Sequence, residues 1–138
     1  PLVQNYFEQY LGQFPAQVFD KINENFIRCS FFELCSRYLS SCYTFAIEQN
    51  NSAGRSDFEM TGIPGTDYYK DDRLAEFKYF KAKEAERMLA LSDPRPEDVA
   101  QVLAYAKDTK VKFPHYHVRS YIVYICANKG WKCWEVTP

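Results

Sequence analysis

The sequence predicts an α/β sandwich in which a mixed sheet is flanked by helices, with a helical segment at the N-terminus. Apolar residues recur at helical spacing over residues 2–13 and stop at a proline. Apolar and polar residues alternate over 57–60 and again over 74–78, as in two half-buried strands. A nearly continuous apolar run over 118–127 is typical of a central strand that is covered on both faces. Helices packed on both faces of one sheet would bury all of these apolar surfaces.

The N-terminal region predicts helices whose role is packing. The first apolar stripe ends at Pro15, and a second stripe follows it directly. Ser30 and Glu33 have the spacing of a capping box that would open a third helix, although one continuous helix also fits the pattern. We expect residues 1–42 to form a helical segment that packs on a core made of residues 43–138.

The middle of the chain predicts three strands. Residues 43–48 alternate between apolar and polar side chains and end in a polar stretch, 48–54, that reads as a loop. The segments 54–60 and 74–78 are joined by a run rich in glycine and proline, 61–72, which turns the chain back. These two segments are therefore expected to form a hairpin-like pair.

Four charged side chains are expected to share one patch of this hairpin. Residues two apart in a strand project to the same face, so Glu76 lies beside Lys78, and Arg55 beside Asp57. Two carboxylates about 4 Å apart repel by about 4 kcal/mol at an effective dielectric of ~20, and a hard divalent cation removes that penalty. Oxygen ligands favour Mg²⁺ or Mn²⁺ over Zn²⁺. The pattern thus predicts a metal site at one edge of the sheet.

Ion pairing is the alternative interpretation of the same four side chains. Asp57 with Lys78, or Arg55 with Glu76, would form an ordinary cross-strand ion pair on a solvated face. An unrelated phosphoesterase that uses the same carboxylates is a further alternative that the residues leave open.

Two helices are expected after this hairpin. Apolar spacing supports a helix from Ala82 to about Leu91, and a second helix begins at Pro96 after a proline-rich break. Gln101 and Tyr105 are four residues apart and so share one stripe of that second helix. On a helix that flanks the charged strands, Gln101 would orient a phosphate or a water and Tyr105 would stack or hydrogen-bond. A polar flank with a partly buried tyrosine is the alternative.

The C-terminal apolar run and the segment 131–136 are expected to form a final strand pair. Gly130 would supply the positive φ of the turn between them. Cys126 and Cys133 would then lie on opposite faces of the pair, which argues against a zinc site built from them with His115 and His117.

Composition limits the functions that this chain can perform alone. Its 138 residues make one domain, and the chain begins with proline instead of methionine, which predicts a fragment of a longer protein. The net charge of −1 is unlike that of a free-standing nucleic-acid binder. No run is long and apolar enough for a membrane span, so no membrane partner is expected. The five cysteines lack disulfide or zinc spacing, which favours a cytoplasmic protein with free thiols.

The spacing of Asp57, Glu76 and Lys78 resembles the signature of the PD-(D/E)xK nuclease superfamily. The resemblance extends over roughly residues 30–136 and includes Glu48, a Gly-Arg-x-Asp string, and Gln-x-x-x-Tyr on the following helix. These motifs are similar to the branch found C-terminal to AAA-ATPase-like domains in bacterial proteins. Two departures are Ser56, where the signature has a proline, and the long loop between the motif strands.

The resemblance implies a restriction-endonuclease-like fold and a metal-dependent phosphodiester hydrolase. Nucleic acid would be the substrate, with DNA favoured over RNA, and an upstream AAA-ATPase-like domain would be the partner in the parent chain. Mg²⁺, or Mn²⁺, would be the cofactor, bound by Asp57 and Glu76. The alternative is a catalytically silent nucleic-acid- or protein-binding module attached to an ATPase. By resemblance, the catalytic residues would be Asp57, Glu76, Lys78, Glu48 and Gln101, and Arg55 and Tyr105 would bind substrate.

Overall fold

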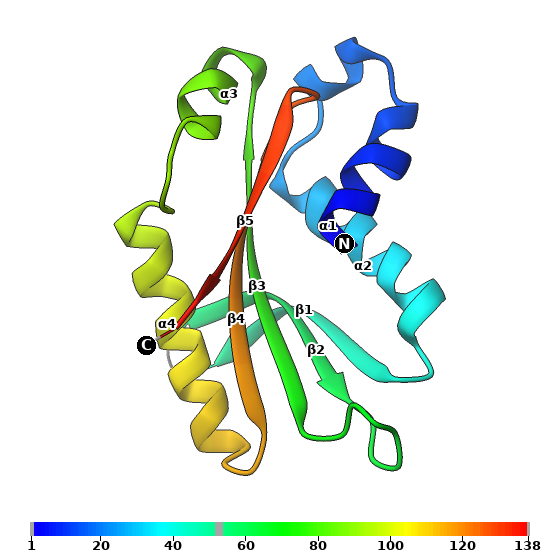
Figure 1. Ribbon diagram of the computed structural model, residues 1–138, viewed down its shortest axis with the longest axis vertical. Helices are drawn as coiled ribbons and strands as arrows, with labels where there is room; N and C mark the ends of the chain where they lie inside the picture. Colours follow the sequence, from blue (N-terminus) through cyan, green and yellow to red (C-terminus); the bar gives the residue numbers. More distant parts are fainter. Residues whose placement is uncertain (1, 52–53, 138) are drawn as a thin grey trace.

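Five strands form one mixed sheet in the computed structural model, in the order β1–β2–β3–β4–β5 (Figure 1). The structure describes residues 2–51 and 54–137, and it describes the side chains of these residues except 48–51 and 54–57. The β3–β4 pair is parallel, and the other three neighbouring pairs are antiparallel. The expected hairpin is confirmed, because β2 pairs directly with β3. The strands are β1 (Tyr43–Asn51), β2 (Gly54–Gly62), β3 (Asp71–Phe80), β4 (His117–Cys126) and β5 (Gly130–Val136).

The helices lie on both sides of this sheet, which confirms the expected α/β sandwich (Figure 1). The N-terminal helical segment occupies one side, and α3 and α4 occupy the other. Between α1 and α2 the chain is helical in short turns at Tyr6–Tyr10, Leu11–Gln13 and Ala16–Asp20. The α-helices are α1 (Leu2–Asn5), α2 (Glu24–Leu39), α3 (Ala82–Leu89) and α4 (Pro96–Lys112).

Of the two interpretations of Ser30, the structure agrees with a helix that continues through it, because Ser30 lies in the interior of α2. The cap is Asn23, whose side-chain oxygen accepts a hydrogen bond from the backbone N–H of Phe26 at 3.0 Å. Ser30 lies in the middle of the helix, where its hydroxyl is 2.6 Å from the Tyr6 hydroxyl and 2.7 Å from the Phe26 carbonyl oxygen. The serine therefore satisfies a buried tyrosine, which the capping-box pattern alone did not reveal.

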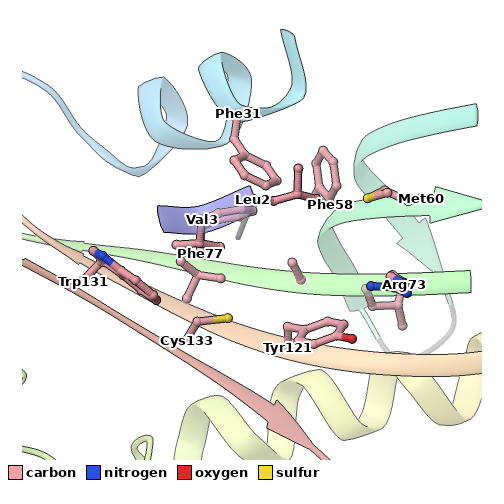
Figure 2. Close-up of a pocket in the computed structure, with 13 residues that line it drawn as sticks. Leu2, Val3, Phe31, Phe58, Met60, Arg73, Phe77, Tyr121, Trp131 and Cys133 are labelled. Atoms are coloured by element: carbon pink, nitrogen blue, oxygen red, sulfur yellow. The ribbon is translucent and has the colours of Figure 1, made fainter. Parts of the chain in front are cut away.

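Aromatic side chains bind the N-terminal helices to the sheet. Phe31 of α2 is buried, and its ring centroid is 5.3 Å from that of Phe58 on β2 and 5.1 Å from that of Phe77 on β3. An apolar cavity of about 510 Å³ adjoins these rings, and Trp131 of β5 lines its other end (Figure 2). This face of the sheet is thus an aromatic core that carries few charged groups.

The opposite face of the sheet carries α3 and α4. Met88 of α3 and Val102 of α4 pack with Ile122 and Tyr124 of β4 in a second apolar cluster. β4 is consequently covered on both faces, as its apolar run predicted. Polar groups on this face lie beneath the helices, where they need hydrogen-bond or ion-pair partners from the protein. The candidate site is built from such groups.

Two local expectations are wrong. The polar stretch 48–54 is mostly strand, because β1 runs to Asn51 and β2 begins at Gly54, and cross-strand pairing outweighs the low strand propensity of these residues. In the β4–β5 turn the positive φ belongs to Ala127, at 48°, and not to Gly130. A Cβ at position 130 would lie 3.0 Å from the end of the Leu89 side chain, so a larger residue there would displace that side chain slightly.

The described residues bear on the expectations for the cysteines and for membrane-spanning helices. All five cysteines are free thiols. Cys126 belongs to the α3–α4 face and Cys133 lines the aromatic cavity, so the two lie on opposite faces as expected. In the described part of the chain, no helix has the length and apolar character needed to cross a membrane.

Candidate active site

Glu76 and Lys78 form an ion pair on the face of β3 that α4 covers. Their nearest charged atoms, Lys78 Nζ and Glu76 Oε1, are 3.3 Å apart. In the parallel register Lys78 lies opposite Tyr124, whose hydroxyl donates to Asp98 on α4. The Glu76 side chain is 2% exposed and that of Lys78 is 19% exposed, so the pair is largely removed from water. β3 is the middle strand, so the expectation that these groups lie on an edge strand is wrong.

Three carboxylates hold Lys78 in its charged form. Burial disfavours the ammonium, but the negative charges of Glu76, Glu24 and Asp98 outweigh that effect and raise the pKa of Lys78 above its usual value. Glu24 begins α2 and Asp98 lies in the first turn of α4, so helices from both sides of the sheet contribute. A cation is thus maintained next to a buried carboxylate.

A buried hydrogen-bond network supports this arrangement. Asp98 is nearly inaccessible and accepts hydrogen bonds from the Tyr124 hydroxyl and, at 2.9 Å, from Arg95 Nε. The same tyrosine hydroxyl accepts a hydrogen bond from the Arg95 backbone N–H at 3.0 Å. The start of α4 is therefore attached to the strand next to Lys78. Buried networks that are fully satisfied hold side chains in one arrangement.

Gln101 and Tyr105 are joined on α4, as their spacing predicted. Gln101 Nε2 donates a hydrogen bond to the Tyr105 hydroxyl at 2.7 Å. Tyr105 is buried and Gln101 is half-buried, so the pair lies on the inner side of the helix that covers Glu76 and Lys78. The amide oxygen of Gln101 is not used in this bond and can accept a hydrogen bond from a water or a substrate.

The predictions for the side chains of Glu48, Arg55 and Asp57 lie outside the described residues. Their backbones belong to β1 and β2, and these two strands pair with each other on both sides of Glu48 and Asp57. β2 also pairs with β3 at Phe58 and Ala75, the immediate neighbours of Asp57 and Glu76. Asp57 and Glu76 therefore each lie one residue away from a directly paired position of β2 and β3.

A family model of the PD-(D/E)XK nuclease superfamily matches residues 22–135, which is most of the chain. The chain belongs to this superfamily. Searches of curated proteins and of solved structures found no match. Membership implies a nucleic-acid substrate, and PD-(D/E)XK nucleases are generally dependent on a divalent metal.

Of the two predicted metal ligands, Glu76 is the one whose side chain the structure describes. Glu76 offers a hard carboxylate at a nearly water-free position, which suits Mg²⁺ or Mn²⁺ in chemical type. Among the side chains that the structure describes, no group of three or more His, Cys, Asp or Glu is arranged to bind a metal ion. The donor chemistry of Glu76 fits the metal, and Asp57 would have to complete the set.

A second acidic pair, Glu59 and Asp72, lies on the same face of the sheet. Asp72 is fully buried, and neither of its oxygens has a hydrogen-bond donor among the described groups. Burial, followed by the proximity of Glu59, raises the pKa of Asp72 to about 9. Asp72 therefore keeps its proton at neutral pH.

Replacing Asp72 with asparagine is expected to stabilise the fold at alkaline pH. Above pH ~4 the unfolded aspartate is ionised, whereas the folded one keeps its proton up to about pH 9. The folded state therefore binds more protons across this window, and the stability of the wild type falls as the pH rises through it. The asparagine side chain has no proton to lose, and its amide would donate to Glu59. Thermal melts from pH 4 to 9 should show an advantage for Asp72→Asn that grows with pH. A pH-independent difference, or the same trend in the exposed control Asp67→Asn, would contradict the raised pKa of Asp72.

Sequence reasoning missed the groups that surround Lys78. Asp98 falls within the helix predicted to begin at Pro96, and Tyr124 within the predicted apolar strand, but neither pattern pointed to Lys78. A tyrosine inside a buried run usually needs a hydrogen-bond partner, and that signal could have predicted a polar group opposite it. The proximity of Glu24 to Lys78 has no signal in the sequence, because it depends on how α2 packs.

Proposed function

We propose that this chain is a metal-dependent phosphodiester hydrolase, a nuclease that acts on DNA in preference to RNA. The observation that carries the proposal is the buried Glu76–Lys78 pair, 3.3 Å apart on the middle strand of a PD-(D/E)XK chain. An ion pair kept only for stability gains little from such burial, because desolvation offsets the attraction. A cleavage site, in contrast, needs a carboxylate and a cation side by side.

Asp57 and Glu76 would bind Mg²⁺ or Mn²⁺, with the Phe77 backbone carbonyl as a further ligand. The proposal is supported by the pairing of β2 with β3 at the residues next to Asp57 and Glu76. A bound divalent ion would polarise the phosphoryl oxygen and make a water more acidic.

The other residues would position and stabilise the reacting groups. The Lys78 ammonium, kept charged by its neighbours, would neutralise negative charge that develops on the phosphate. Gln101, oriented by its hydrogen bond to Tyr105, would orient the attacking water or a phosphate oxygen. Arg55 would bind a neighbouring phosphate, and Glu48 would act as a supporting carboxylate on β1.

The wider organisation is also proposed. Residues 1–42 would be a helical segment that packs on a nuclease-like core of residues 43–138. An AAA-ATPase-like domain would precede this chain in a longer cytoplasmic protein of bacterial origin. Such a domain would provide the positive surface that the net charge of −1 does not.

Cleavage assays test the proposal directly. Plasmid DNA, single-stranded DNA and RNA are incubated with the chain in Mg²⁺ or Mn²⁺, beside an Asp57→Ala variant. We expect cleavage by the wild type, with DNA cut faster than RNA, and none by the variant. Equal activity in the two proteins would show that a contaminant or another site is responsible.

Metal binding gives a second test that does not require turnover. Metal at about 100 times its dissociation constant should stabilise the folded chain by about 2.7 kcal/mol. We expect Mn²⁺ or Mg²⁺ to raise the melting temperature of the wild type and of Asp67→Ala, an exposed-carboxylate control, but not that of Asp57→Ala. If no metal raises the melting temperature of the wild type, the chain is the silent binding module of the alternative hypothesis.

A further inference from the structure

Five side chains from two connections form an exposed surface at one end of the sheet, which we call the tyrosine–lysine surface. Both connections lie at the end of the molecule where β3 begins and α4 ends (Figure 1). The backbone N–H of His117 donates to the Lys70 carbonyl oxygen at 2.6 Å, which joins the two connections. The surface consists of Tyr69 and Lys70, between β2 and β3, and Lys110, Phe113 and Tyr116, at the end of α4 and before β4.

The rings of Tyr69 and Phe113 face solvent, and the half-buried ring of Tyr116 contacts both of them. Tyr69 and Tyr116 are in edge-to-face contact with centroids 6.0 Å apart, and the Phe113 and Tyr116 centroids are 5.3 Å apart. Tyr69 is nevertheless 46% exposed and Phe113 is 39% exposed. Large rings that stay this accessible are more typical of a binding surface than of a core.

The connection that carries Tyr69 is held firmly in place. A Cβ at position 62 would lie 1.6 Å from the Tyr68 carbonyl oxygen, so only glycine allows the chain to fold back there. Thr66 Oγ1 donates to the Ile63 carbonyl oxygen at 2.7 Å, and the Asp71 N–H donates to the Tyr68 carbonyl oxygen at 3.0 Å. Since the rings are already positioned, ordering them on binding costs little.

Lysine ammonium groups lie next to these rings. Lys70 Nζ is 5.8 Å from the centroid of the Tyr69 ring, and Lys110 Nζ donates to the Tyr116 carbonyl oxygen at 2.6 Å. Among the described side chains, neither lysine forms an ion pair. The adjoining open groove, of about 1090 Å³, adds Lys107 and His117, and its two carboxylates, Asp71 and Glu135, are paired with Arg73 and Arg119. This end of a chain with net charge −1 therefore offers positive charge to an anionic partner.

We infer that the tyrosine–lysine surface binds single-stranded nucleic acid, with bases stacked on Tyr69, Phe113 and Tyr116 and phosphates near Lys70 and Lys110. Exposed rings next to cations suit unpaired bases, because the faces of paired bases are covered within a duplex. The inference rests on the proposed nuclease function and gives its substrate class. From Lys70 to Glu76 along β3 is roughly 20 Å, which a strand bound at this surface would span to reach the proposed site.

Fluorescence anisotropy of labelled oligonucleotides, at low salt and without divalent metal, tests this inference. The probes are a single strand of oligo-dT, the corresponding oligo-U RNA, and a DNA duplex of the same length. We expect both single strands to bind more tightly than the duplex. Tyr69→Ala and Tyr116→Ala should each weaken single-strand binding by about tenfold or more, the effect of losing one stacked base. Tyr69→Phe should bind like the wild type because it keeps the ring.

Two further variants separate the contributions of charge and of general surface changes. Lys70→Ala should lower the slope of log K against log salt by about 0.7, the value for one phosphate contact on a single strand. Tyr38→Ala removes an even more accessible tyrosine, on α2 at the other side of the sheet, and should leave binding unchanged. Melting temperatures of all variants show whether any loss of binding comes from unfolding.

The results separate this inference from the proposed function. Single-strand binding that depends on Tyr69 and Tyr116, in a chain that cleaves nothing with metal, would support the surface and refute the nuclease. If the wild type cleaves with metal but the tyrosine variants bind single strands as well as the wild type does, the nuclease is supported and the role of the surface is refuted. Tighter binding to duplex than to single strands, or no detectable binding of the wild type to any probe, would overturn the inference.

Discussion

Replacing Lys78 with alanine is expected to lower the cleavage rate by about 10²- to 10³-fold, the typical cost of losing one charge-stabilising donor. Lys78 is the cation beside Glu76 at 3.3 Å, and three carboxylates favour its charged form. Without it, charge that develops on the phosphate has no ammonium next to the buried carboxylate. Steady-state rates on the fastest-cleaved substrate would show the loss in kcat.

Lys83→Ala is the matched control, because it removes an exposed lysine from the neighbouring helix α3. A second variant, Lys78→Arg, keeps the positive charge next to Glu76 and so protects the fold, but it replaces a compact ammonium with a planar guanidinium. We expect it to melt near the wild-type temperature and to cleave slowly. Near-full activity in Lys78→Ala would remove this lysine from the mechanism.

Truncation of Phe31 to alanine is expected to lower the free energy of unfolding by about 3–5 kcal/mol, as for other buried phenylalanines. The side chain is 4% exposed and contacts the rings of Tyr6, Phe58 and Phe77, with centroids 5.1 to 5.3 Å away. Phe58 and Phe77 directly follow Asp57 and Glu76 in the sequence, so Phe31 also supports both motif strands from the opposite face. Urea denaturation would measure the loss.

The adjacent residue provides a control of the same type. Phe32 is half-buried on α2, and its ring is in edge-to-face contact with that of Phe45, with centroids 6.0 Å apart. Phe32→Ala should therefore cost clearly less than Phe31→Ala. Equal losses for the two variants would mean that helix propensity or general burial, and not the aromatic cluster, attaches α2 to the sheet.

The sequence by itself determined the elements of this fold and the pairs that lie within one element. Helical spacing and strand alternation predicted the α/β sandwich because both patterns depend only on near neighbours in the chain. The same local geometry put Glu76 beside Lys78 and Gln101 beside Tyr105, and the structure brings both pairs together. The sequence left open whether a helix begins at Ser30 or continues through it, and the structure shows the second, with the cap at Asn23.

Only the tertiary structure decided which distant groups meet. β3 became the middle strand through the parallel β3–β4 pairing, and strand order is not encoded in any one segment. Two of the carboxylates around Lys78 come from α2 and α4, and the raised pKa of Asp72 depends chiefly on its burial in the folded chain. Side-chain charge states respond to every neighbour in space, whereas sequence patterns report only neighbours along the chain.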